Sequence, residues 1–229
     1  MSLSRLRRRI KDVQKKFQLL WRFAQNARNR RMSIAYIRHW RKSPIQAKTI
    51  LYEAFAGRGL VDNPKALFEA MMGDKDFADW THIWVLDDFA NHRATLAQYA
   101  SVPNVRFVQF GSKAYMRAVA TSQVLVNNVT FYKFFVKRPG QTYINPWHGI
   151  PLKHLGVRTD RLKVINVLRN FCHVDYLISA CPFLTEVYER DFQLGSRFGG
   201  EILEAGYPRL DTLVQTRRDE VLSRLIGGG

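Results

Sequence analysis

The sequence predicts an α/β fold, in which a Rossmann-like domain with a parallel sheet follows a basic amphipathic helix. Short runs of apolar and β-branched residues alternate with amphipathic segments of helical length, as right-handed βαβ units require. Polar or glycine-containing loops follow most of these runs, which is where open α/β sheets place their ligand sites. The positive charge is concentrated near the N-terminus, in a stretch whose apolar residues recur with a helical period.

The N-terminal segment, residues 1–43, is the basic helical part. Residues 1–48 contain fifteen Lys or Arg and a single acid, Asp12, so they carry +14 of the formal net charge of +17. Apolar residues recur every three or four positions from Leu3 to Ala24, and a second basic piece runs from Met32 to Lys42. We expect this segment to lie on an anionic membrane surface. Docking on the rest of the protein, a coiled-coil seam and binding to nucleic-acid phosphates remain alternatives for the same stripe.

Residues 44–226 are expected to form the Rossmann-like domain. Each expected strand is an apolar run bounded by turn residues, and Asp62-Asn63-Pro64 is expected to put a capping residue before a proline at the first position of a helix. The expected strands are 49–55, 82–86, 105–110, 123–127, 142–144, 176–179 and 201–205. The expected helices are 64–72, 93–100, 113–120, one within 161–170, 182–191 and one from 210 onward. The three glycines at 227–229 are typical of a linker or a cloning scar.

Several kinds of site are not expected. The sequence contains neither G-x-G-x-x-G nor G-x-x-x-x-G-K-[ST], so no nucleotide cofactor is predicted, and it contains no G-x-S-x-G. His148 and His154 have a poor spacing for zinc, and no metal is predicted. Cys172 and Cys181 are expected to be buried thiols, and no apolar run reaches the length of a membrane span.

The loop that follows the strand at 142–144 is the most promising place for chemistry. It combines prolines, glycines, histidines and a lysine within residues 145–156. His148 is the best candidate for a general base, since histidine exchanges a proton near neutral pH and its neighbours Trp147 and Gly149 hold it in place. The alternative is a core histidine that bonds to a backbone carbonyl. Gly57-Arg58-Gly59, after the strand at 49–55, forms a loop that can approach a ligand closely.

Four motifs resemble, in the same order, those of the CDP-glycerol glycerophosphotransferase family, the teichoic acid primases and polymerases. They extend over roughly residues 49 to 215, and Ile150 stands where the family usually has threonine in W-H-G-T-P-L-K. The motifs are Leu51-Tyr52-Glu53-Ala54-Phe55 with Gly57, Asp62-Asn63-Pro64-Lys65-Ala66, Trp147-His148-Gly149-Ile150-Pro151-Leu152-Lys153 and Gly206-Tyr207-Pro208-Arg209-Leu210-Asp211.

The resemblance implies the N-terminal half of a GT-B fold, with the active site in a cleft between two Rossmann-like domains. His148 would be the base that activates a glycerol hydroxyl of a lipid-linked polyprenyl acceptor. CDP-glycerol would bind mainly to a C-terminal domain beyond this chain, so the chain alone is expected to show little or no turnover. The resemblance also places the enzyme at the cytoplasmic face of the membrane. We predict as substrate-binding residues Gly57, Arg58, Trp147, Gly149, Lys153 and Arg209, with Lys153 and Arg209 as phosphate contacts.

Two other classes of function remain open from the sequence. One is a non-catalytic acceptor-binding or scaffold domain of a larger transferase. The other is a nucleic-acid-binding module that uses its basic segment, although no nucleic acid is expected as a partner because the core lacks a recognisable motif for one.

Overall fold

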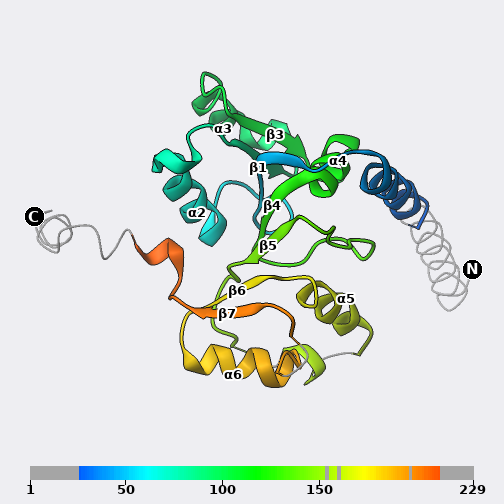
Figure 1. The fold of residues 1–229 in the computed structure, drawn as a ribbon, viewed down its shortest axis with the longest axis vertical. Helices are drawn as coiled ribbons and strands as arrows, with labels where there is room; N and C mark the ends of the chain where they lie inside the picture. Colours follow the sequence, from blue (N-terminus) through cyan, green and yellow to red (C-terminus); the bar gives the residue numbers. More distant parts are fainter. Residues whose placement is uncertain (1–25, 153–154, 159–160, 196–197, 212–229) are drawn as a thin grey trace, which may run out of the picture.

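The computed structural model describes residues 26–152, 155–158, 161–195 and 198–211 (Figure 1). Its centre is a seven-stranded sheet in the order β3-β2-β1-β4-β5-β6-β7, with every neighbouring pair parallel. The strands are β1 (Gln46–Glu53), β2 (Thr81–Leu86), β3 (Val105–Gln109), β4 (Ser122–Asn127), β5 (Thr142–Asn145), β6 (Tyr176–Ser179) and β7 (Glu201–Glu204). The predicted Rossmann-like fold is therefore confirmed.

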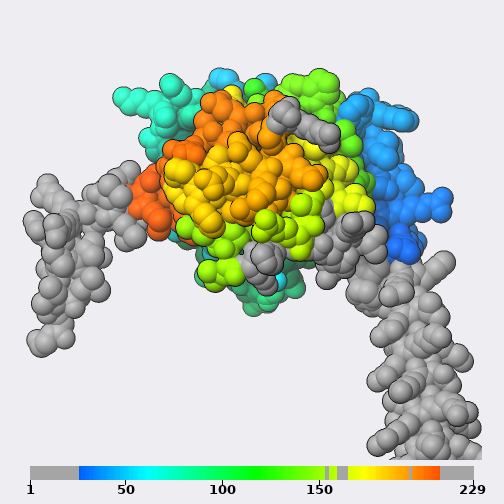
Figure 2. Space-filling model, turned by 90° about the horizontal axis from the view of Figure 1, so that it is seen from below, coloured from blue at the N-terminus to red at the C-terminus, as the bar shows by residue number. Residues whose placement is uncertain are grey.

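Helices cover the sheet on both faces. The longer ones are a helix over residues 26–42, α2 (Asp62–Gly73), α3 (Arg93–Gln98), α4 (Lys113–Thr121), α5 (Arg161–Phe171) and α6 (Pro182–Asp191). Short 3-10 turns are η1 (Lys75–Phe77), η2 (Phe89–His92), η3 (Gly156–Arg158) and η4 (Pro208–Leu210). Seen from below in Figure 2, the yellow and orange segments from β6 to η4 form one face, and the blue residues 26–42 lie at its flank.

Alternating residues of β1 build two apolar layers. Leu51 of β1 packs into the larger core cluster, together with α4 and α6, whereas its neighbours Ile50 and Tyr52 pack on the other face with Phe68 of α2. Successive side chains of a strand point to opposite faces, so a strand buried on both sides is apolar at consecutive positions. The strand order reverses between β1 and β4. The carboxyl ends of these two strands therefore form the switch point where such sheets bind ligands.

The helix over residues 26–42 packs against the domain. Met32 and Tyr36 are buried, and the Tyr36 hydroxyl donates to the Val136 carbonyl at 2.6 Å. Trp40 donates to the same carbonyl from Nε1 at 3.0 Å. Docking on the rest of the protein was one of the alternatives for the basic segment. It holds for the buried side of the helix over residues 26–42. The amphipathic pattern from Leu3 to Ala24 lies outside the described residues.

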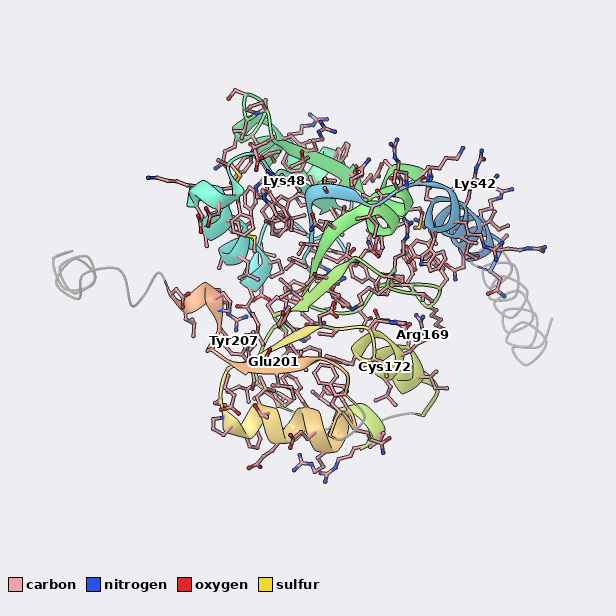
Figure 3. All side chains as sticks on the ribbon, viewed as in Figure 1. Lys42, Lys48, Arg169, Cys172, Glu201 and Tyr207 are labelled. Carbon is pink, nitrogen blue, oxygen red and sulfur yellow. The ribbon has the colours of Figure 1, made fainter. Side chains whose placement is uncertain are left out.

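Two smaller expectations are wrong. Cys172 is exposed because it lies just past the end of α5, as Figure 3 shows, whereas Cys181 is half-buried. Asp62 is the first residue of α2, and Val61 precedes it without a side-chain capping bond. The Asp62 and Asn63 side chains are used elsewhere, at the carboxyl edge of the sheet.

Candidate functional site at the carboxyl edge of the sheet

The loop after β5 is fixed in place by the aromatic core. Trp147 has a positive φ of 49°, which is uncommon for a large side chain, and its backbone N–H donates to Asn145 Oδ1 at 2.9 Å. Its ring is buried against Phe171 and Phe192, with ring centres 5.6 Å away in each case. The structure thus places Trp147 in the core, where it holds the turn that presents His148.

His148 is half-buried, and one of its ring nitrogens is bonded. Nδ1 lies 2.7 Å from the carbonyl oxygen of Asn128, which can only accept, so Nδ1 carries the proton in this bond. In the neutral ring Nε2 is then the unprotonated nitrogen, which is the form that a general base needs. Among the described residues, none bonds to Nε2. The ring also packs against Trp147 at 4.2 Å and edge-on against Phe55 at 5.6 Å.

Asn128, directly after β4, joins three segments at this point. Its Oδ1 accepts from the Phe55 N–H at 3.0 Å, and its Nδ2 donates to Asp62 Oδ2 at 2.6 Å. Its backbone carbonyl is the partner of His148. The loop after β1 and the start of α2 therefore hold Asn128 in place, and Asn128 in turn orients the His148 ring. Because several bonds determine this arrangement, the His148 ring is preorganised.

Asn63 fastens the His148 loop from the other side. It is fully buried, and its Nδ2 donates to the carbonyls of Pro146 at 2.9 Å and Trp147 at 3.0 Å. Its Oδ1 accepts from the backbone N–H of Arg209 at 3.3 Å. The roles of Asp62 and Asn63 are not apparent from the sequence, because an Asp-Asn-Pro run before an apolar stretch has the same pattern as a helix cap. The one indication of these roles in the sequence is that both residues belong to one of the four motifs that resemble the family.

Arg209, on η4, lies against the same loop. Its Nη1 forms an ion pair with Asp62 and donates to the His148 carbonyl at 2.9 Å. Its guanidinium also stacks over the Tyr207 ring at 4.6 Å, where the orange segment after β7 leaves the sheet in Figure 3. These contacts make Arg209 a residue that positions the His148 backbone. Its predicted phosphate contact remains a prediction.

The other predicted substrate residues are placed differently. Gly57 has φ +92°, and a Cβ there would lie 2.7 Å from the Asp87 backbone nitrogen. Gly57 thus lets the loop close onto the end of β2, where its carbonyl accepts from the Asp87 N–H at 2.7 Å. Arg58 is exposed, and Gly149 has open space around it, directly next to His148. Lys153 lies outside the described residues.

A buried carboxyl group supports the rim from below. Glu53, at the end of β1, is only 1% exposed and accepts hydrogen bonds from the Tyr115 hydroxyl at 2.7 Å and from Asn127 Nδ2 at 3.1 Å. Burial raises the pKa of Glu53 to about 8, although the two hydrogen bonds act in the opposite direction. Asn127 directly precedes Asn128. The Glu53 carboxyl therefore braces the strand end that carries the partner of His148.

Comparisons with known proteins show the family of this chain. The profile of the CDP-Glycerol:Poly(glycerophosphate) glycerophosphotransferase family matches residues 34–226. The chain belongs to this family. Within the described residues, no three His, Cys, Asp or Glu side chains are grouped so that they could hold a metal ion. Among the same residues, no helix is long and apolar enough to span a membrane.

The curated relatives in the family are teichoic acid enzymes. A teichoic acid poly(glycerol phosphate) polymerase of Bacillus spizizenii is 31% identical over 192 residues, which cover 80% of this chain and 46% of that protein. A teichoic acid glycerol-phosphate transferase of Staphylococcus aureus is 30% identical over 187 residues, or 77% of this chain and 45% of that protein. The chain thus spans about half the length of these two relatives.

Solved structures show the same fold. A histidine-to-alanine variant of the wall teichoic acid polymerase TagF superposes with a TM-score of 0.70 at 26% identity, over 95% of this chain and 52% of that one. A variant of TagF soaked with CDPG gives the same TM-score. The seven-stranded domain therefore corresponds to part of the GT-B-like fold of TagF. The family membership and the fold expected from the four motifs are both confirmed.

Proposed function

We propose that this chain supplies the acceptor-side half of a CDP-glycerol-dependent glycerophosphotransferase, with His148 as the general base. A glycerol hydroxyl of the acceptor attacks the β-phosphate of CDP-glycerol. A phosphodiester forms, the bond to CMP breaks, and His148 Nε2 takes the hydroxyl proton. An alcohol is a weak nucleophile at neutral pH, so a base positioned beside it lowers the barrier.

One observation carries this proposal. The Asn128 carbonyl accepts the Nδ1 proton of His148 at 2.7 Å, which leaves Nε2 as the basic nitrogen at the carboxyl edge of the sheet. The alternative of a core histidine bonded to a backbone carbonyl explains the bond at Nδ1. It does not explain a half-buried ring whose second nitrogen has no partner among the described residues, or the network from four segments that holds it.

The donor is proposed to bind mainly outside this chain. The two relatives described above are about twice as long as the region they share with this chain, and one solved TagF variant was soaked with CDPG. We therefore assign the CDP-glycerol site to a second domain that faces the His148 rim. Arg58, Gly149, Lys153 and Arg209 are the remaining candidates for substrate contact from this side. Glycine at position 149 leaves room for a substrate beside the base.

The acceptor is proposed to be lipid-linked and to be reached from the membrane surface. The helix over residues 26–42 contains six Lys or Arg and no Asp or Glu. Its outward side also exposes Ile34 and Ile37, which are 58% and 43% exposed. Cations with apolar residues between them suit the headgroup zone of an anionic bilayer. These features support the peripheral position at the cytoplasmic face that we propose for the enzyme.

The test compares two histidine variants of the full transferase, with its donor-binding half present. His148→Ala is expected to lower transfer of radiolabelled glycerol phosphate from CDP-glycerol by at least about 10²-fold, because a positioned base contributes roughly 10²–10⁴-fold. His92→Ala is the matched control. His92 lies after β2, bonded to Asp87 at 2.8 Å, and its loss should leave transfer near normal.

Folding is checked in parallel by thermal melting of both variants. Near-normal CMP release by a folded His148→Ala enzyme would remove His148 as the base. The chain would then be better described as an acceptor-binding domain without catalytic groups.

A further inference from the structure

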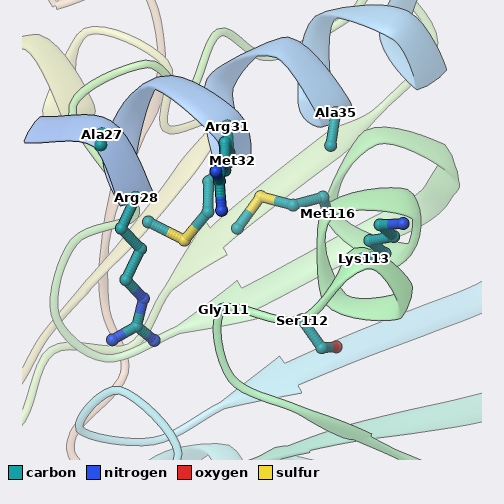
Figure 4. Close-up of a pocket in the computed structure, with 9 residues that line it drawn as sticks. All are labelled: Ala27, Arg28, Arg31, Met32, Ala35, Gly111, Ser112, Lys113 and Met116. Carbon is teal, nitrogen blue, oxygen red and sulfur yellow. The ribbon is translucent and has the colours of Figure 1, made fainter. Parts of the chain in front are cut away.

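A groove of about 440 Å³ runs between the helix over residues 26–42 and α4 (Figure 4). Its floor is apolar, since Met32 and Met116 are 6% and 1% exposed and Ala35 lies beside them. Methionine is flexible and polarisable, so such a floor adapts to apolar chains of irregular shape. The groove is separate from the His148 rim residues, and none of them lines it.

The rim of this groove is cationic. Arg28 and Arg31 extend from the helix, Lys113 extends from α4, and all three side chains are exposed. Among the described residues, none of the three forms an ion pair with a carboxylate. Figure 4 shows Arg28 directed toward Gly111 at one end of the groove, where a Cβ on the glycine would come within 3.0 Å of Arg28 Nη2.

The positive field extends along the same side of the helix. The pKa of His39 is lowered, first by burial and then by the positive charges of Arg117 and Arg38. Arg117 lies one turn beyond Lys113 on α4, so α4 contributes a second cation near His39 of the helix over residues 26–42. Unpaired cations above an apolar floor are complementary to one class of ligand, an amphiphile with an anionic head.

We propose that this groove binds one molecule of an anionic membrane lipid, with its phosphate between Arg28 and Lys113 and its first acyl carbons on Met32 and Met116. Free phosphate or an anionic polymer would use the cations but would gain nothing from the methionine floor. The lipid also fits the outward side of the helix, where Ile34 and Ile37 would enter the interface beside the bound headgroup. The proposal goes beyond the transfer reaction and does not depend on His148.

The first experiment measures the binding of a lipid in the groove directly. In the full chain, methionine is labelled with ¹³C in its methyl group, and dihexanoyl phosphatidylglycerol is added below its micelle concentration. The Met32 and Met116 signals are expected to shift with saturation, while Met71 and Met72 on α2 act as internal references. Glycerol phosphate, which has the head without the chains, should shift them weakly. Equal shifts with glycerol phosphate, or no response from Met32 and Met116, would overturn the proposal.

The second experiment measures partition onto vesicles of phosphatidylglycerol in phosphatidylcholine. The double variant Arg28→Gln/Lys113→Gln is compared with Lys75→Gln/Arg93→Gln, which removes the same charge from exposed positions outside the groove. The groove variant is expected to bind about tenfold more weakly, and the control less than about twofold. Equal losses in the two variants would mean diffuse charge attraction and would refute a lipid site. Neither experiment measures transfer, so a failure here is distinct from a failure of the His148 assignment.

Discussion

Glu53 offers a test of the rim that needs no substrate. Its carboxyl group is buried at the end of β1 between Tyr115 and Asn127, and burial raises its pKa to about 8 from an ordinary value of 4.5. The folded chain therefore keeps this proton up to about pH 8, whereas the unfolded chain releases it near pH 4.5. We predict that Glu53→Gln, which cannot titrate, removes a pH dependence of stability that the wild type shows.

The sign and size follow from proton linkage. Between pH 4.5 and pH 8 the unfolded state binds fewer protons than the folded state, so the free energy of unfolding falls as the pH rises. Each unit of pKa difference corresponds to about 1.36 kcal/mol. Between pH 5 and pH 8 the wild type should lose about 3–4 kcal/mol through this group, and Glu53→Gln should lose none of it.

The measurement is urea unfolding at intervals from pH 5 to pH 8, with the wild type and the variant compared at each pH. The difference between the two curves isolates Glu53, because all other titrating groups are shared. Glu69→Gln removes a carboxylate from the exposed side of α2, where it pairs with Lys65 at 3.2 Å, and serves as the matched control. If Glu53→Gln and the wild type gave parallel curves, the buried carboxyl would not be protonated and the reasoning would fail.

Three further predictions concern packing and backbone, each measured by urea unfolding at neutral pH. Asn63→Ala removes two donated hydrogen bonds and one accepted bond and should cost about 2–4 kcal/mol. Gly57→Ala should cost about 2–4 kcal/mol, because φ is +92° and the new Cβ meets backbone at 2.7 Å, whereas Gly149→Ala, with open space, should cost less than about 0.5 kcal/mol. Tyr36→Phe loses the 2.6 Å bond to the Val136 carbonyl and should cost about 1 kcal/mol, and an unchanged midpoint would mean that this bond does not hold the helix over residues 26–42.

The sheet could be predicted from sequence because its strands are short apolar runs with clear stops. The expected run at 176–179 is β6 itself, and 182–191 is α6 itself. The beginning of β1 was less visible, since Gln46 is polar and half-buried and Lys48 is exposed. The Lys48 N–H donates to the Gln123 side chain at 2.8 Å, and the Lys48 ammonium pairs with Asp79. A local sequence pattern therefore predicts the buried part of a strand but not its polar beginning.

The site was only partly predictable, because its bonds join residues that are far apart in the chain. His148 could be singled out from its own loop, but its partner is the carbonyl of Asn128, and every residue has a carbonyl. Arg209 could be recognised as a cation near the rim. That it pairs with Asp62, 147 positions away, depends on how β7 is placed beside the rest of the sheet. The sequence can suggest which residues belong to such a network, but it does not show which of them bond to each other.

The network also predicts how variants around His148 should differ from variants of His148. Asn63, Asn128 and Arg209 each bond to the backbone of its loop or to its ring, and none of them has to touch a reacting atom to act. Small displacements of a base are costly, because proton transfer depends on distance and direction. Loss of one of these residues should therefore lower stability and transfer together. Loss of the His148 imidazole should lower transfer while stability changes little, since a half-buried ring contributes modest packing. A His148 variant that unfolded as readily as Asn63→Ala would indicate that the ring holds the loop, instead of the loop holding the ring.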